Sequence, residues 1–197
     1  MNIKNAILTR RSTRKYKAIP LDKETINKVV EAGRYAPSGG NSQNTHFIVI
    51  TNKEILVKLQ ENVKKAFASM EITPGMYKSM ANSIRLSKSG TYIYDYNAPV
   101  LIITANKKEY GNNMADISCA LENMMIMANE LDLGSCWINQ LRWLNENETI
   151  LNIMYELGMD PSERVYGALA LGIADTEDGL PNRNPLPRTG NKVTYID

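Results

Sequence analysis

The sequence contains few of the residues that do chemistry on their own: two cysteines and one histidine in 197 residues. Cys119 and Cys136 are too few for a disulfide framework, and neither belongs to a Cys-x-x-Cys pair, so we expect no metal site. His46 opens the apolar stretch 46–50, where a histidine is more often a structural residue than a catalytic one. These absences exclude most hydrolase mechanisms, and an enzyme of this composition would take its chemistry from a bound cofactor.

Long apolar runs and an excess of one charge sign are missing as well. The longest apolar stretches, such as residues 47–50 and 100–103, are far shorter than the ~20 residues that span a bilayer, and the N-terminus shows no signal peptide. The 23 basic and 21 acidic residues leave a net charge of +2, which does not favour general binding to nucleic acid. We therefore expect a cytoplasmic protein that binds neither membranes nor nucleic acid.

The length and the 43% content of apolar residues predict one domain over residues 1–197. Apolar periodicity predicts a central sheet covered by helices, in an α+β or α/β sandwich with four or five strands. Residues 71–97 lack a clear period and are a candidate lid, and residues 175–197 form a C-terminal arm whose end at 192–196 could add an edge strand to another subunit. The predicted helices cover residues 3–9, 22–36, 53–70, 113–132 and 146–157, and the predicted strands cover 46–51, 99–105, 134–138 and 165–174.

A basic segment at residues 10–17 holds five lysines and arginines in eight positions. One interpretation is a solvated basic face or a nucleic-acid patch. In an extended chain, however, Arg10, Ser12 and Arg14 project to the same side and span roughly 13 Å. Such a row suits a ligand with a phosphate at one end and a polar ring system at the other, because guanidinium groups bind phosphate through two donors.

Three further segments are candidates for binding. In the loop 36–43, Gly39 and Gly40 permit a flat ligand to approach the backbone closely, although a plain turn after a helix is the alternative. Residues 134–140 could offer backbone amides to a ligand, and Cys136 reads as a small buried residue because no histidine or cationic cluster is near it in sequence. Arg183, held among prolines, either closes an anion site or belongs to a plain surface tail. No dinucleotide-binding or P-loop motif is present.

Taken together and in this order, these segments resemble the FMN-dependent nitroreductase family, over nearly the whole chain. The sequence departs from the family pattern in having Asn44-Thr45 where Pro-Trp is common after the loop, and Pro181 where many members have a second basic residue. It also has Asn139 and Gln140 where many relatives have glycine. The matching segments are Arg10–Tyr16, Ala36–Gln43 with His46–Val49, the long helix leading into Leu133–Ile138, residues 168–172 and Arg183–Leu186.

The resemblance implies an α+β three-layer sandwich with a central, mostly antiparallel sheet, a homodimer, and a C-terminal arm exchanged with the partner subunit. Two FMN sites would lie at the dimer interface, each built from both chains. Arg10 and Arg183 would face the phosphate, Arg14 the pyrimidine end of the ring, and residues 138–140 the N5 edge. The implied FMN-binding residues are Arg10, Arg11, Ser12 and Arg14 from one subunit and Pro37, Ser38, Gly39 and Asn41 from the partner, together with Gln43, Ile138, Asn139, Gln140 and Arg183.

The implied reaction has two steps: NADH or NADPH gives a hydride to flavin N5 and leaves, and a nitroaromatic, quinone or enone acceptor is then reduced in the same pocket. Because the chemistry lies at flavin N5, no catalytic side chain is expected, and Arg14 would offset the negative charge of the reduced ring. Two alternatives stay open. One is a divergent flavoprotein of the same fold, such as a dehalogenase, a heterocycle oxidase or a flavin-fragmenting enzyme. The other is a non-enzymatic FMN-binding or nucleic-acid-binding module that uses the basic segment.

Overall fold

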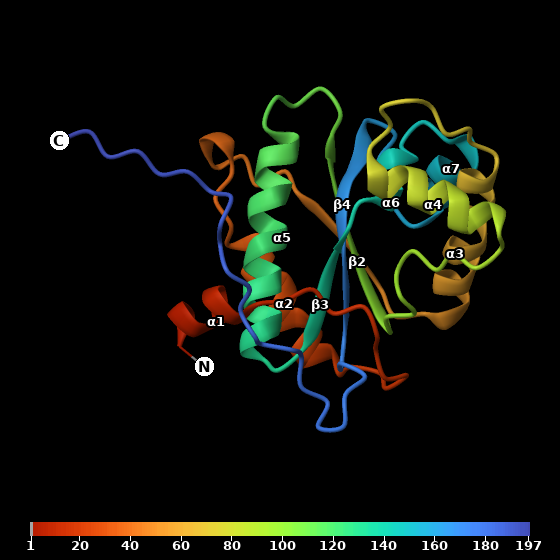
Figure 1. Cartoon of the computed structure of the whole chain (residues 1–197). Helices are drawn as coiled ribbons and strands as arrows, with labels where there is room; N and C mark the ends of the chain where they lie inside the picture. Colours follow the sequence, from red (N-terminus) through yellow and green to blue (C-terminus); the bar gives the residue numbers. More distant parts are fainter. Residues whose placement is uncertain (1) are drawn as a thin grey trace.

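One antiparallel sheet of four strands, in the order β1-β2-β4-β3, forms the middle of the protein (Figure 1). The computed structural model describes residues 2–197. Its strands are β1 (His46–Ile50), β2 (Val100–Lys107), β3 (Gly134–Ile138) and β4 (Glu163–Gly172). Each neighbouring pair is antiparallel, with Ile48 opposite Ile103, Ile102 opposite Leu169, and Cys136 opposite Ala170. Every residue of β2 except Lys107 is buried, because helices cover both faces of the sheet.

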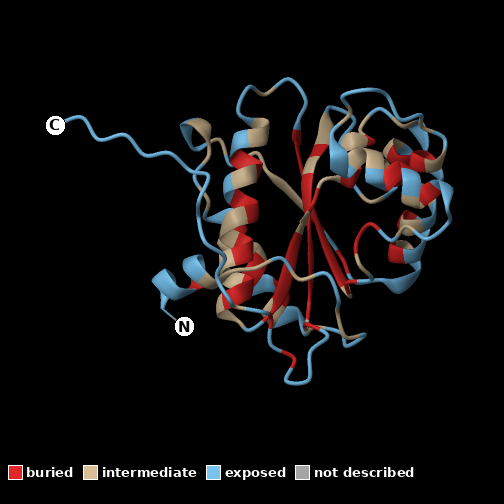
Figure 2. Ribbon diagram, in the orientation of Figure 1, coloured by how far each residue is buried: buried red, intermediate tan, exposed pale blue. Residues whose placement is uncertain are grey.

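The helices form a layer on each side of the sheet, and their buried stripes face it (Figure 2). One layer contains α1 (Ile3–Thr9), α2 (Lys23–Arg34) and α5 (Asn113–Glu130). The other contains α3 (Lys53–Ala68), α4 (Lys78–Lys88), α6 (Gln140–Trp143) and α7 (Glu148–Glu156), and a short 3-10 turn, η1, covers Gly39–Asn41. Among the described residues, no helix is long and apolar enough to cross a membrane.

Two separate apolar cores result from the alternation of side chains along the central strands. In β2, Leu101 and Ile103 pack towards the layer of α3 and α7, whereas Val100 and Ile102 pack towards α2 and α5. Successive side chains of a strand point to opposite faces, so the apolar run at residues 100–103 supplies both cores at once. The structure is therefore the three-layer α+β sandwich that the sequence predicts.

The basic segment, residues 10–17, lies along the free edge of β3, and backbone pairing there fixes the direction of the segment's side chains. Ser12 pairs with Ser135 and Tyr16 with Ala174 as isolated bridges, and Thr13 donates its N–H to the Ser135 carbonyl at 2.9 Å. Gly134 permits this approach, since a Cβ there would lie 2.7 Å from Thr13 Cγ2. Backbone pairing thus covers a strand edge that would otherwise expose unpaired groups.

The structure confirms the predicted strands and long helices to within a few residues, and it adds two helices. Helix α4 lies inside residues 71–97, where no period is visible, because Ser83 and Ser87 occupy buried positions beside Ile84. Helix α6 has four residues, too few to show a period. The single chain forms no strand at residues 192–196, so pairing of that stretch with a partner remains a prediction.

Candidate functional site

The side chains of Arg10, Ser12 and Arg14 act on one buried group, the Cys136 thiol. Cys136 is 3% exposed, and its burial raises the pKa of the thiol, while the Arg14 charge, a hydrogen bond with Ser12 and the Arg10 charge oppose that shift in decreasing order. An effect of all three residues on the same thiol agrees with the alternation of side chains in an extended chain, which puts Arg10, Ser12 and Arg14 on one side of the segment. Because the net effect keeps the thiol protonated, Cys136 is a small buried residue rather than a nucleophile.

Arg14 is held beside an aromatic ring from the end of the 71–97 segment. Its Cζ lies 5.9 Å from the centroid of the Tyr96 ring, which is within cation–π range. Tyr96 and Asn97 both have left-handed backbone, with φ of 58° and 56°, a conformation that is costly for an aromatic residue. The buried Asp95 carboxylate stabilises this turn by accepting from Gln60 Nε2 at 2.8 Å and from the Asn97 N–H at 3.1 Å.

Arginines from both ends of the sequence gather along the last turns of α5. Arg183 Nη2 donates to the carbonyl oxygen of Asn129 at 2.5 Å and pairs with Asp132 Oδ1 at 2.6 Å, which neutralises the negative end of the helix. Arg10 Nε lies 3.4 Å from Glu122 Oε1, and Arg11 Nη1 donates to the Asn184 carbonyl at 2.5 Å. The Arg10 Nε is buried and makes no hydrogen bond with the described residues.

The loop 36–43 is held in a strained conformation by residues distant in sequence. The Asp116 carboxylate accepts from the Gly39 N–H at 3.0 Å, and Tyr110 donates its hydroxyl to the Gly39 carbonyl at 3.0 Å. Gly40, Asn41 and Gln43 all have positive φ. A Cβ on Gly39 would lie 2.1 Å from Asn112 Nδ2 and 2.7 Å from the Tyr110 hydroxyl, so any larger residue would displace side chains that surround the loop.

A hollow of about 530 Å³ lies against this loop. It is open to solvent on one side, and its walls come from the C-terminal end of α2, the loop, β1 and α5. Four of the five predicted loop residues line it, namely Pro37, Ser38, Asn41 and Gln43, together with Asp116 at its base. None of the predicted residues at positions 10–14, 138–140 or 183 belongs to its lining.

The residues after β3 are tied to their own neighbours. Ile138 is 1% exposed and belongs to the core on the α3 side of the sheet. Trp137 Nε1 donates to Asn139 Oδ1 at 3.0 Å, and the Asn139 N–H donates to Gln140 Oε1 at 3.0 Å. Gln140 Nε2 then donates to the Tyr92 hydroxyl at 2.7 Å, which connects this turn to the 71–97 segment.

The loop 36–43 and Arg183 are anchored at opposite ends of α5, whereas Arg10 pairs with Glu122 near the middle of the helix. Asp116, which holds the loop, is in the first turn of the helix, and Asn129, which holds Arg183, is in the last. At ~1.5 Å per residue the two anchors are roughly 20 Å apart. One chain therefore holds the loop about 20 Å from Arg183 and does not bring them to one place.

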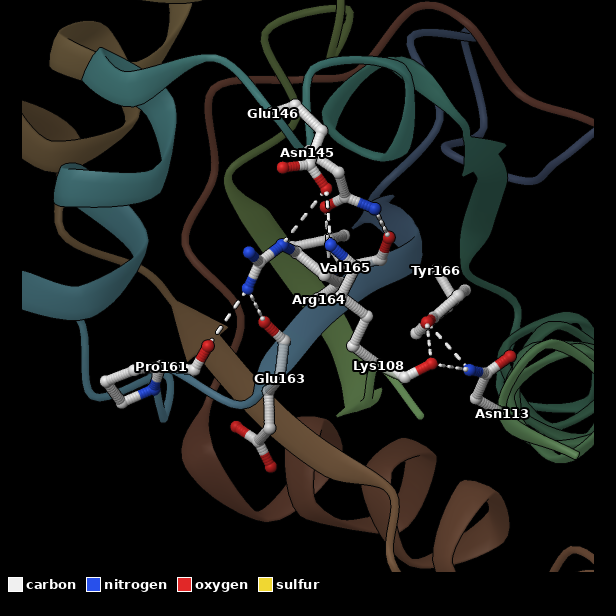
Figure 3. Close-up of polar contacts among 9 residues, drawn as sticks. All are labelled: Lys108, Asn113, Asn145, Glu146, Pro161, Glu163, Arg164, Val165 and Tyr166. Atoms are coloured by element: carbon white, nitrogen blue, oxygen red, sulfur yellow. Dashed lines mark hydrogen bonds and ion pairs between the residues drawn. The ribbon is translucent and has the colours of Figure 1, made fainter. Parts of the chain in front are cut away.

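A different polar cluster, where β2 ends and β4 begins, is structural (Figure 3). Asn145 Nδ2 donates to the Val165 carbonyl at 2.7 Å, and the Val165 N–H donates to Asn145 Oδ1 at 3.0 Å. Asn113 Nδ2 donates to the Tyr166 hydroxyl at 2.7 Å. Nearby, His46 Nδ1 lies 2.9 Å from Glu163 Oε2, so His46 is a satisfied structural residue as predicted, although it is only partly buried. These groups satisfy one another and tie the ends of α5 and α6 to β4.

Sequence reasoning missed the residues that hold the site in place: Asp116, Tyr110, Asp95 and Tyr92. Each makes a hydrogen bond with a residue between 35 and 77 positions away in the sequence. The only local signal is at Asp116, a carboxylate on the buried face of an apolar helix, which needs a donor to be stable there.

Comparison with known proteins agrees with this fold. The model of the Nitroreductase family matches residues 7–173. A crystal structure of a nitroreductase with bound FMN from Bacteroides fragilis superposes with a TM-score of 0.86 over 100% of both chains, at 31% identity. A protein of Archaeoglobus fulgidus named as an NADH dehydrogenase/NAD(P)H nitroreductase is 29% identical over 177 residues, which cover 87% of this chain and 84% of that protein. A nitroreductase with bound FMN from Desulfitobacterium hafniense shares the fold, with a TM-score of 0.82 at 22% identity.

Proposed function

The chain belongs to the nitroreductase family, and we propose that it is an FMN-dependent oxidoreductase that works as a homodimer with NADH or NADPH as electron donor. When bound, FMN would supply hydride transfer between the nicotinamide donor and an acceptor of the nitroaromatic, quinone or enone type. Donor and acceptor would occupy the same pocket in turn. The protein would bind the cofactor, orient it and provide positive charge beside it.

The residues present fit an FMN phosphate. Arg10 and Arg183 contact the C-terminal half of α5, and Arg11 donates to the carbonyl of Asn184, next to Arg183; a guanidinium group can bind a phosphate through two donors. The buried Nε of Arg10 lies 3.4 Å from Glu122 Oε1 but makes no hydrogen bond with the described residues, so a bound anion would give it an acceptor. Arg14, further along the same row and fixed by Tyr96, would lie beside the ring.

The single observation that carries the proposal is that α5 holds two half-sites apart, the loop 36–43 at its first turn and Arg183 at its last. A second copy related by a two-fold axis would place the loop of one chain against the arginines of the other and would form two equal sites. Exposed apolar side chains support such a partner: Ile3 and Ile7 on α1 are 70% and 51% exposed, and Ile196 at the end of the arm is 93% exposed. In Figure 1, α1 and the C-terminal arm lie on the same side as α5.

The first test is a visible spectrum of protein purified without added flavin, followed by anaerobic addition of NADH or NADPH. We expect a flavin spectrum that bleaches with one or both nucleotides. A flavin spectrum that neither nucleotide changes would favour the divergent flavoproteins of this fold. A colourless protein that also fails to bind added FMN would overturn the proposal.

The shared site is tested by mixing two inactive variants. One chain carries Arg14→Ala and Arg183→Ala, and the other carries Gly39→Ala, which forces the loop away from Asn112. After co-refolding at equal amounts, about a quarter of all sites should be intact, because half of the dimers are mixed and each has one undamaged site. A mixture that binds no more FMN than the separate variants would contradict a site built from two chains.

A further inference from the structure

In the turn after β3, the side chain of Gln140 is oriented by a hydrogen bond to Tyr92, a residue outside the turn. Gln140, at the first position of α6, is buried, yet its carboxamide makes hydrogen bonds at both ends. Its Oε1 accepts from the Asn139 N–H at 3.0 Å, and its Nε2 donates to the Tyr92 hydroxyl at 2.7 Å. Because a backbone N–H can only donate, the amide cannot be turned over, and Nε2 must face Tyr92.

The remaining hydrogens in this network follow from the same reasoning. Ser83 Oγ lies 2.7 Å from the Tyr92 hydroxyl and 3.1 Å from the carbonyl oxygen of Ser79. A carbonyl can only accept, so Ser83 donates to Ser79 and Tyr92 donates to Ser83. Hydrogen bonds therefore run in one direction from Asn139 through Gln140, Tyr92 and Ser83 to helix α4.

The part of the 71–97 segment that carries this network is firmly packed. Ser83 is 2% exposed, and the Tyr92 ring packs edge-on against Phe67 with centroids 5.9 Å apart. Burial raises the pKa of Tyr92, so its hydroxyl keeps its proton and remains a donor at neutral pH. Helices α4 and α6 lie on the same side of the sheet, so the network crosses between neighbouring elements (Figure 1).

We propose that Tyr92 is a positioning residue, which through its hydrogen bond to Gln140 sets the geometry of the 138–140 turn beside the flavin. This inference rests on the proposed function, since that function places the turn at the reacting edge of the ring. Only one of the two N–H groups of Gln140 Nε2 is used by Tyr92, so the second is a donor for a bound group. The 71–97 segment thus influences the reaction through a fixed hydrogen bond to the turn.

The test compares Tyr92→Phe with Tyr77→Phe. Both substitutions remove one hydroxyl from the same segment and keep the ring, but the Tyr77 ring packs on Trp143 and is 68% exposed. Tyr92→Phe should lower the rate of flavin reduction by NAD(P)H about fivefold, the effect of one lost neutral hydrogen bond. Stoichiometric FMN binding should persist, with a melting temperature within about 4 °C of the native protein. Tyr77→Phe should match the native protein.

Two further measurements separate positioning from simple stability. In the Gln140→Ala background, adding Tyr92→Phe should change the reduction rate no further, because both substitutions break the same path. The side-chain amide signals of Gln140, identified by their loss in Gln140→Ala, should shift in Tyr92→Phe protein prepared without flavin. This second readout does not depend on any bound cofactor.

Each alternative outcome overturns the inference in a recognisable way. Unchanged amide signals in Tyr92→Phe would mean that the hydrogen bond does not hold Gln140. Shifted signals with a native reduction rate would mean that the contact is structural only, and fully additive rate effects would mean that Tyr92 acts on something else. If the native protein binds no FMN, the proposed function fails first, and the role at the flavin fails with it while the amide signals still report the contact.

Discussion

At the scale of single residues, neighbours rather than residue type decide what each basic side chain of residues 10–14 does. Arg10 pairs with Glu122 on α5, Arg11 reaches the carbonyl of Asn184 in the arm, and Arg14 lies over the Tyr96 ring. The three guanidinium groups are thus fixed in different directions by different elements. Positive charge that is held in place interacts more strongly with a bound anion than charge on a free side chain, because less conformational freedom is lost on binding.

Replacing Arg14 with alanine should weaken FMN binding by about 10- to 100-fold, the effect expected when one hydrogen bond to a charged group is lost. Flavin fluorescence on titration measures the affinity, and anaerobic bleaching by NAD(P)H measures reduction. Lys15→Ala is the matched control, because Lys15 is exposed and projects to the other side of the segment. Native affinity together with native reduction in Arg14→Ala would show that Arg14 does not contact the cofactor.

The two cysteines should differ strongly in reactivity. Burial raises the pKa of Cys136 despite the nearby Arg14 charge, so its thiolate is scarce at neutral pH, whereas Cys119 is exposed on α5. Iodoacetamide at neutral pH should leave Cys136 unmodified in the folded Cys119→Ser variant and should modify it after unfolding in urea, as measured by mass spectrometry. Rapid modification of the folded variant would contradict this.

At the scale of elements, α5 organises the site although it supplies none of the predicted ligand contacts. Its first turn anchors the loop through Asp116, and its last turns anchor Arg10 and Arg183. The helix is packed against β4, β3 and α2, so the distance between its two ends is rigid. Because α5 keeps the loop and Arg183 apart, we propose that a partner chain completes the site.

Asp116→Ala should destabilise the protein by about 1–3 kcal/mol, because it leaves the Gly39 N–H without an acceptor beside a loop with three left-handed residues. It should also weaken FMN binding, since Ser38, Asn41 and Gln43 would lose their fixed positions. Thermal denaturation and flavin titration measure the two effects.

Asp116→Asn keeps one oxygen acceptor and should restore most of both properties. If Asp116→Ala lowers stability but leaves FMN affinity native, the loop conformation does not matter for binding.

At the scale of the whole molecule, the last part of the C-terminal arm, residues 186–197, is exposed at every position. Leu186, Val193 and Tyr195 are 57%, 70% and 84% exposed, and Figure 1 shows the end of the chain running away from the body. Apolar side chains gathered on a terminal segment are characteristic of an interaction site. The partner that we propose for this segment is a second copy of the chain.

Deleting residues 186–197 should leave the fold intact and weaken the dimer. The deletion keeps Arg183 and the Asn184 carbonyl that Arg11 uses, and it removes exposed residues only. Circular dichroism should be unchanged, while sedimentation should show a dimer dissociation constant at least about tenfold higher, with FMN affinity falling in parallel. A truncated chain that dimerises like the native protein would show that the arm does not bind the partner.

The sequence by itself determined the elements and the nature of the binding groups. Apolar residues that recur with period 2 in strands and 3.6 in helices indicate which face of each element is buried. The strands β1 to β4 and the helices α2, α3, α5 and α7 were therefore predictable. Helix α4 was not, because serines at its buried positions hide the period. The basic row and the glycine loop were recognisable because their properties are local.

Only the tertiary structure decided how far apart the binding groups lie and what holds them. The anchors Asp116, Tyr110 and Tyr92 lie 77, 71 and 48 positions from the residues they bond, and no local pattern encodes such a pair. The separation of the half-sites along α5 is likewise a property of packing. Short-range preferences depend on neighbouring residues, whereas a binding site depends on distances that exist only after the helices have docked on the sheet.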